Sequence, residues 1–168
     1  MVQITGRQKH SSKYDRLQDL QESIYRHMML LLPDKLSSYD YFLSKINDLP
    51  VLHLEILEQH TYTSFVRLTY QLGQGISEPE AHIRVCHDLR VAEVTAFNQH
   101  QGIERLAAPD MNPSRLEQIH WRQNRALHKW LDYLLQQGHS LQTMQATTRP
   151  YSPQQQEKAK LETTSLDP

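Results

Sequence analysis

Charged and histidine side chains gather in the middle of the chain. His87 and Asp88 are adjacent, and an imidazole beside a carboxylate can serve as an acid–base pair. Arg84 comes just before them and Glu93 just after. A guanidinium group oriented by an acidic neighbour can bind carboxylates or phosphates. These four residues are therefore the first candidates for a binding or catalytic site.

Arg67 and Glu55 are further candidates. If their strands are neighbours, Arg67 and Arg84 lie side by side and could bind an anionic ligand, with Glu55 and Glu93 orienting them. The competing interpretation is structural. An exposed cross-strand ion pair contributes only about 0–1 kcal/mol and is common. Asp88, in that interpretation, accepts backbone N–H groups and shapes a turn.

An alternating pattern predicts the strands that position these candidates. If His87 and Arg90 flank a short turn, Arg84 lies opposite Glu93, and the neighbouring apolar residues share the other face. An earlier hairpin with a turn near residues 60–62 places Glu55 opposite Arg67. Short connections favour an antiparallel meander, because parallel strands need long crossovers. Pro79 is assigned to a loop between strands.

One helix is predicted before the strands in the sequence and a second helix after them. Ser12 and Asp15 have the spacing of a capping box, and an apolar stripe then continues toward Pro33. The second helix begins after Asn112, and Gly138 follows its end.

These elements predict an α+β fold, consisting of an N-terminal helix, a five-stranded antiparallel meander and a C-terminal helix. Both helices cover one apolar face of the sheet, and the other face is polar. Residues 13–138 form a single domain. Residues 1–12 are expected to be a disordered N-terminus and residues 139–168 a disordered tail, because both segments have few large apolar side chains.

Composition narrows the classes of function. The formal net charge of −1 argues against nucleic acid and anionic membranes as partners. The apolar run at residues 28–32 is far too short to span a bilayer, and no secretory signal precedes it. Cys86 is the single cysteine and cannot form an internal disulfide. We therefore expect a cytoplasmic protein.

No catalytic, metal or cofactor site is predicted. The chain has ten histidines, but their spacing does not form a tight ligand cluster, so we expect no metal. It has only five glycines and no Gly-x-Gly-x-x-Gly motif, so we expect no dinucleotide cofactor. No base is positioned to activate Cys86.

The run IRVCHDLRVAEV at residues 83–94 resembles the central signature of the YqiB-like proteins, a proteobacterial family of unknown function. Weaker similarities extend the resemblance over residues 17–138. They are Leu31-Leu32-Pro33, Thr61-Tyr62-Thr63, and Asn124 with Leu127, Trp130, Leu131, Tyr133 and Gly138. The resemblance implies a compact cytoplasmic domain in a bacterium and implies no reaction.

Three hypotheses of function follow. The preferred one is a non-enzymatic binding or regulatory module, acting through its polar sheet face and hairpin edge on a protein partner or a small anionic ligand. The alternative is a small-metabolite-processing enzyme that uses His87, Asp88, Arg84 and Glu93. The third is a subunit that completes its core by dimerisation. The sequence does not fix the oligomeric state.

Overall fold

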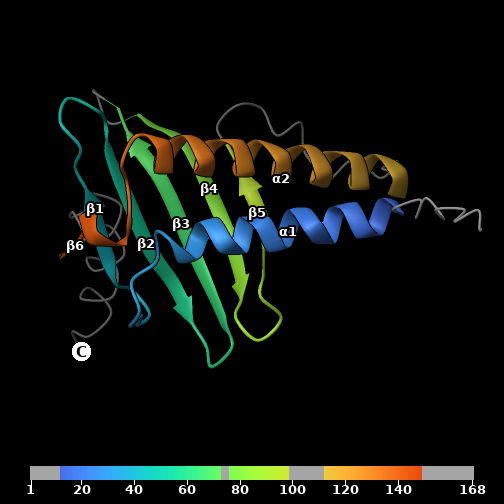
Figure 1. Cartoon of the computed structure of the whole chain (residues 1–168), viewed down its shortest axis with the longest axis horizontal. Coiled ribbons are helices and arrows are strands. Elements are labelled where there is room, and N and C mark those ends of the chain that lie inside the picture. Colours follow the sequence, from blue (N-terminus) through green and yellow to red (C-terminus); the bar gives the residue numbers. More distant parts are fainter. Residues whose placement is uncertain (1–11, 73–75, 99–111, 149–168) are drawn as a thin grey trace, which may run out of the picture.

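Figure 1 shows two long helices lying across one face of an antiparallel sheet. The computed structural model describes residues 12–72, 76–98 and 112–148. The elements in chain order are α1 (Lys13–Met29), β1 (Tyr41–Ser44), β2 (Val51–Gln59), β3 (Thr63–Gln71), β4 (Ser77–Cys86), β5 (Val91–Phe97), α2 (Pro113–Gln136), a short 3-10 helix (Leu141–Thr143) and β6 (Met144–Thr147). Across the sheet the strands are ordered β5-β4-β3-β2-β1-β6. The predicted α+β class, with both helices on one face, is confirmed.

Both predicted hairpins have the predicted register. Glu55 is the partner of Arg67 in the β2–β3 pair, and Arg84 is the partner of Glu93 in the β4–β5 pair. The β4–β5 turn is longer than two residues, since the last pair joins Cys86 to Val91. The longer turn affects only the residues between Cys86 and Val91. The strand residues face the sides of the sheet that were predicted.

The number of strands was predicted wrongly. A sixth strand, β6, pairs antiparallel with β1 at the edge of the sheet, inside the segment expected to be a disordered tail. His139 anchors this segment, because its side chain is 1% exposed and its Nδ1 lies 2.7 Å from Ser44 Oγ. Its Nε2 lies 3.0 Å from the Tyr70 hydroxyl. The remaining segments predicted to be disordered, residues 1–11 and 149–168, lie outside the described residues.

Strand β4 begins earlier than predicted and contains Pro79, which we had assigned to a loop. The register of the β3–β4 pair shifts between Thr69 and Gln71, opposite this stretch, and β5 pairs with β4 only from Ala81 onward. Proline is tolerated in a strand where the ladder is irregular or one side is unpaired, because its missing N–H is not needed there.

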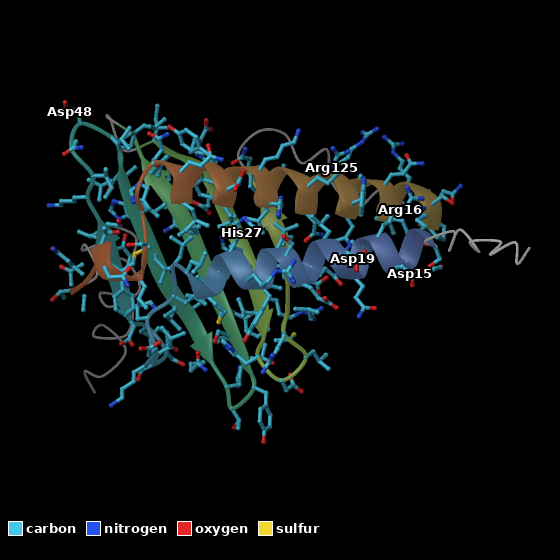
Figure 2. The ribbon with its side chains drawn as sticks, viewed as in Figure 1. Asp15, Arg16, Asp19, His27, Asp48 and Arg125 are labelled. Carbon is cyan, nitrogen blue, oxygen red and sulfur yellow. The ribbon has the colours of Figure 1, made fainter. Side chains whose placement is uncertain are left out.

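The two helices are parallel and begin at the same end of the molecule. The predicted capping box of Ser12 and Asp15 begins α1, and Asn112 caps α2. Lys13 Nζ lies 2.8 Å from a Glu117 oxygen near the start of both helices. Figure 2 shows Asp15 on the part of α1 that extends beyond β5. The helices therefore reach past the edge of the sheet.

The core fills the layer between the helices and the sheet. Strand residues of one parity and the apolar stripes of both helices contribute fully buried side chains. Those with no exposed surface include Ile24, Met28, Leu52, Leu54, Ile56, Val66, Leu68, Leu127, Leu131 and Leu134. Burying one such side chain contributes roughly 1.5–3 kcal/mol. On β2, β3 and β4 the residues of opposite parity face away from the helices. This side of the sheet, which no described helix covers, is the open face (Figure 1).

One core position of α2 is polar. The Asn124 side chain is fully buried, and its Oδ1 accepts a hydrogen bond of 3.0 Å from the backbone N–H of Val94. Its Nδ2 donates to the carbonyl of His120 at 2.9 Å. Asn124 therefore satisfies a backbone donor of the edge strand β5, which would otherwise be orphaned.

Replacing Asn124 with leucine is expected to lower the free energy of unfolding by about 1–3 kcal/mol, because the Val94 N–H stays buried without a partner. Urea denaturation measures the change. Arg125→Leu, one residue along on the exposed side of α2, is the control and should change stability by less than about 0.5 kcal/mol. Equal stability of both variants would show that the Asn124–Val94 bond contributes nothing.

Candidate functional site

The polar side chains of the open face come from three central strands. His53 and Glu55 alternate with buried apolar residues along β2, and Arg67 does so along β3. Glu80 and His82 do the same on β4. Side chains alternate between the two faces along a strand. The antiparallel register therefore brings these residues next to one another on the open face, across β2, β3 and β4.

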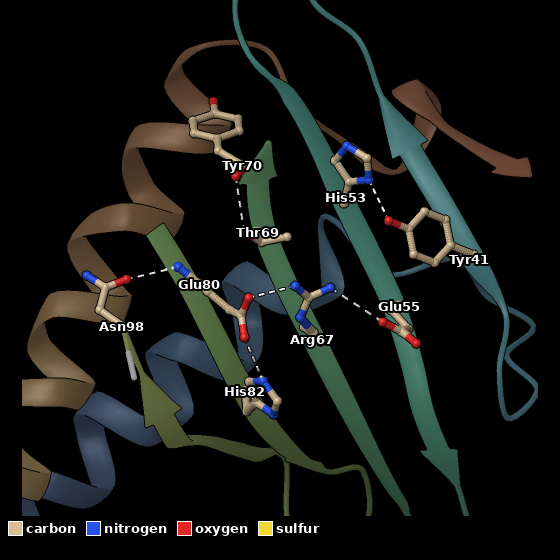
Figure 3. A network of polar contacts seen from close by, with 9 residues as sticks. All are labelled: Tyr41, His53, Glu55, Arg67, Thr69, Tyr70, Glu80, His82 and Asn98. Atoms are coloured by element: carbon tan, nitrogen blue, oxygen red, sulfur yellow. Dashed lines mark hydrogen bonds and ion pairs between the residues drawn. The ribbon is translucent and has the colours of Figure 1, made fainter. Parts of the chain in front are cut away.

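Arg67 lies at the centre of this group (Figure 3). Its Nη2 donates a hydrogen bond of 2.6 Å to Glu80 Oε2, and its Nη1 lies 3.6 Å from Glu55 Oε2. The other oxygen of Glu80 is 3.0 Å from His82 Nε2. Glu55, Arg67, Glu80 and His82 form the Arg67 network.

The acidic members of the Arg67 network lie deeper than the basic ones. The side chains of Glu55 and Glu80 are 3% and 12% exposed, whereas those of Arg67 and His82 are 25% and 32% exposed. Burial raises the pKa of Glu80, but hydrogen bonds from Arg67 and His82 outweigh it and hold this pKa below its usual value. Burial lowers the pKa of Arg67, but Glu80 and Glu55 outweigh it and raise this pKa. Arg67 and Glu80 are therefore a charged pair near neutral pH.

Tyr41 and His53 lie beside the network. The Tyr41 hydroxyl is 2.5 Å from His53 Nδ1, and both residues are buried. Burial lowers the pKa of His53, and the charge of Arg67 lowers it further. The imidazole is therefore neutral at pH 7, and its Nδ1 can accept the hydroxyl proton of Tyr41 in a hydrogen bond.

Arg84 and Glu93 form the predicted ion pair. Glu93 also has contacts that the sequence did not indicate. Its Oε2 lies 3.1 Å from Gln21 Nε2 of α1 and 3.1 Å from His120 Nε2 of α2. Glu93 thus joins β5 to both helices, while the Arg84 side chain is 47% exposed. Arg84 is the more accessible member of the pair.

Arg67 and Arg84 are diagonal neighbours, because Arg67 is paired with His82 across the β3–β4 ladder and Arg84 with Phe65. Each guanidinium meets its own carboxylates, Glu55 and Glu80 for Arg67 and Glu93 for Arg84. The structure therefore holds the two arginines in separate ion pairs.

His87 lies on the helix side of the sheet. Its Nε2 is 2.7 Å from the hydroxyl of the buried Ser64, and its ring meets that of Tyr25 on α1 edge-on, with 6.2 Å between centroids. Asp88 is exposed in the β4–β5 turn. The structure therefore does not bring His87 and Asp88 together with Arg84 and Glu93.

Sequence reasoning missed Glu80 and Tyr41. Glu80 follows Pro79, which was assigned to a loop, although Glu80 has the same parity as His82 and Arg84. That shared parity was the available signal. The contact of Tyr41 with His53 depends on the register of the β1–β2 pair, which the sequence did not specify.

Two kinds of feature are absent from the described residues: a cluster of metal ligands and a membrane-spanning helix. Among residues 12–72, 76–98 and 112–148, no three histidine, cysteine, aspartate or glutamate side chains gather as metal ligands would. No helix in this part of the chain is long and apolar enough to cross a membrane.

Comparison with known proteins gives one match. A family model described as "Protein of unknown function (DUF1249)" matches residues 27–140, which is more than half of the chain. Neither the curated proteins nor the solved structures contain a match. The matched segment contains the Arg67 network, Arg84, His87 and Glu93.

Proposed function

Because the chain belongs to the DUF1249 family of proteins of unknown function, we propose a role from its geometry: a non-enzymatic binding module. Its binding surface is the open face, centred on Arg67 and Arg84. Its ligand is a protein partner that presents acidic side chains to these two arginines.

The observation that carries this proposal is the layering of charge on the open face. Glu55 and Glu80 lie beneath, and the groups nearest to solvent are the guanidinium of Arg67, the imidazole of His82 and the guanidinium of Arg84. A docking partner therefore meets the two guanidinium groups before it meets Glu55 and Glu80. The carboxylates beneath reduce the net charge, so we expect moderate affinity and strong sensitivity to salt.

The arginine side chains are also held in place before a partner arrives. A guanidinium has five N–H donors, and within the described residues the only hydrogen bond of Arg67 goes to Glu80. The remaining donors can bind a carboxylate of the partner. Because Glu80 and Glu55 already fix the side chain, little side-chain entropy is lost on binding.

The separation of His87 from the open face favours the binding module over the enzymatic alternative. An acid–base pair acts on a substrate only within hydrogen-bond reach of the reacting group. His87 contacts Ser64 and Tyr25 on the helix side, whereas Arg84 belongs to the open face. His87 and Arg84, two residues of that hypothesis, therefore lie on opposite sides of the sheet.

Two further parts of the proposal rest on the sequence. We place the protein in the cytoplasm, because its one cysteine cannot form an internal disulfide. We also propose that it is a YqiB-like protein, on the resemblance of residues 83–94.

Affinity capture with the immobilised protein tests the binding surface. Arg84→Gln should reduce recovery of the specific partner by about tenfold, the effect of losing one charge-assisted hydrogen bond. Arg125→Gln, which removes the same charge from the exposed side of α2, should leave recovery unchanged (Figure 2). Quantitative mass spectrometry of the captured proteins gives the ratios. Equal recovery by both folded variants would remove Arg84 from the binding surface, and a bound small anion seen in native mass spectra would favour the small-ligand alternative.

A further inference from the structure

An open cavity is lined by residues next to the β2–β3 and β4–β5 turns, among them Thr61 and His87. Figure 1 shows these two turns near each other at one end of the sheet. Its volume is about 560 Å³, within the range of about 300–1,000 Å³ typical of small-molecule sites. Its walls come from the end of α1, the loop that follows α1, and residues Gln59, Thr61 and His87. The cavity does not include the Arg67 network.

His87 lines this cavity and carries a hydrogen-bond acceptor on its ring. The Ser64 hydroxyl donates to Gln59 Oε1 at 2.6 Å, so its oxygen accepts from His87 Nε2, 2.7 Å away. The proton of a neutral His87 is therefore on Nε2, which leaves a lone pair on Nδ1. Burial lowers the pKa of His87 and outweighs the opposing charge of Asp88, so the imidazole is neutral at pH 7. No described residue donates a hydrogen bond to Nδ1.

The cavity also carries one charge of each sign. Asp34 and Lys35 are adjacent in the loop after α1, both line the cavity, and both are exposed. In the described part of the chain neither of them forms an ion pair. Met29 and Leu36 provide an apolar wall beside them. The lining thus combines an anion, a cation, a neutral acceptor and an apolar surface.

We propose that this cavity binds a small zwitterion with an apolar side chain, the chemical class of the apolar α-amino acids. The ligand ammonium group is held by Asp34 and donates a hydrogen bond to His87. Its carboxylate lies against Lys35, and its side chain packs on Met29 and Leu36. This inference does not depend on the open face, so each of the two proposals can fail without the other.

NMR titration of the full chain with L-leucine tests the inference. The imidazole of His87 and the backbone amides of Gln59 and Thr61 should shift in a saturable way. Two analogues keep the side chain and lack one charged group: isocaproate lacks the amine and isoamylamine lacks the carboxylate. Each should bind at least about fivefold more weakly than leucine, the effect of one partly solvated ion pair.

Matched variants identify the charges that bind. Asp34→Asn and Lys35→Gln should each weaken leucine binding by about fivefold. Asp48→Asn and Lys45→Gln make the same changes near the β1–β2 turn, and should leave binding unchanged. Figure 2 shows Asp48 at the opposite end of the sheet from the β2–β3 turn. All four side chains are exposed, so the fold should survive each change.

Three results would overturn the assignment. They are the absence of a saturable shift with leucine, binding of either analogue as tight as that of leucine, and equal weakening by the control variants. The first result would show that the cavity does not bind apolar amino acids. The second would show that binding does not need both charged groups of the ligand, and the third would show that Asp34 and Lys35 are not the residues that bind them.

Discussion

Replacing Arg67 with methionine is expected to lower the free energy of unfolding by about 2–4 kcal/mol. The change removes the cation that lies 2.6 Å from Glu80 and 3.6 Å from Glu55, and both carboxylates are largely buried. A buried carboxylate that loses its counter-charge is much less stable than either the intact pair or a neutral replacement. The expected loss is below that of a fully buried pair, because the Arg67 side chain is 25% exposed. Urea denaturation at pH 7 measures it.

A compensating variant separates this effect from simple loss of packing. Glu55→Gln and Glu80→Gln added to Arg67→Met should restore stability to within about 1 kcal/mol of the original protein, because no buried charge remains. Arg84→Met is the matched control for the loss of an arginine. Its side chain is 47% exposed, so it should cost less than about 1 kcal/mol. A triple variant as unstable as Arg67→Met would refute the electrostatic explanation.

Acidification from pH 7 to pH 5 is expected to destabilise the fold markedly, because of its buried histidines. His53 and His139 are 6% and 1% exposed. Burial lowers the pKa of both, and the charge of Arg67 adds to the effect at His53. Below about pH 6.5 the unfolded chain therefore binds protons that the folded chain does not. Each of these histidines then removes up to about 1.4 kcal/mol of stability per pH unit until its folded form also protonates.

The slope of stability against pH tests this expectation. Urea denaturation between pH 7.5 and 5 should give a free energy of unfolding that falls as the pH falls. His53→Gln combined with His139→Gln should flatten the slope, whatever it does to stability at pH 7. His60→Gln is the control, because this side chain is 60% exposed, and the slope should not change. His87, His120 and His128, whose pKa values are also lowered by burial, should leave a smaller slope of the same sign. An unchanged slope in the double variant would contradict the assignment.

The register of the two hairpins could be predicted because one face of each strand is apolar. A slip by one residue would move Leu54 and Ile83 out of the core, so the alternation alone pairs Glu55 with Arg67 and Arg84 with Glu93. The facing of the candidate binding residues was therefore available from the sequence.

The features that the sequence did not predict depend on contacts with residues far away in the chain, which the sequence does not identify. Strand β6 has four residues, only one of them large and apolar, and is ordered by pairing with β1. His139 and Asn124 are polar residues at buried positions, where they are stable only because Ser44, Tyr70 and the Val94 N–H lie within reach. Glu80 was missed because the proline before it suggested a loop. In each case a contact distant in sequence decides the local structure.

Photo-crosslinking in living cells tests most directly whether the open face is the binding surface. A benzophenone side chain at Phe65, the cross-strand partner of Arg84, should crosslink to a defined protein. The same group at Arg125, on the exposed side of α2, should not crosslink to that protein. Adding Arg84→Gln should reduce the yield of the Phe65 adduct by about tenfold. Crosslinking of the same protein from Arg125, or an undiminished Phe65 adduct after Arg84→Gln in a folded protein, would contradict the proposal that the partner docks on the open face.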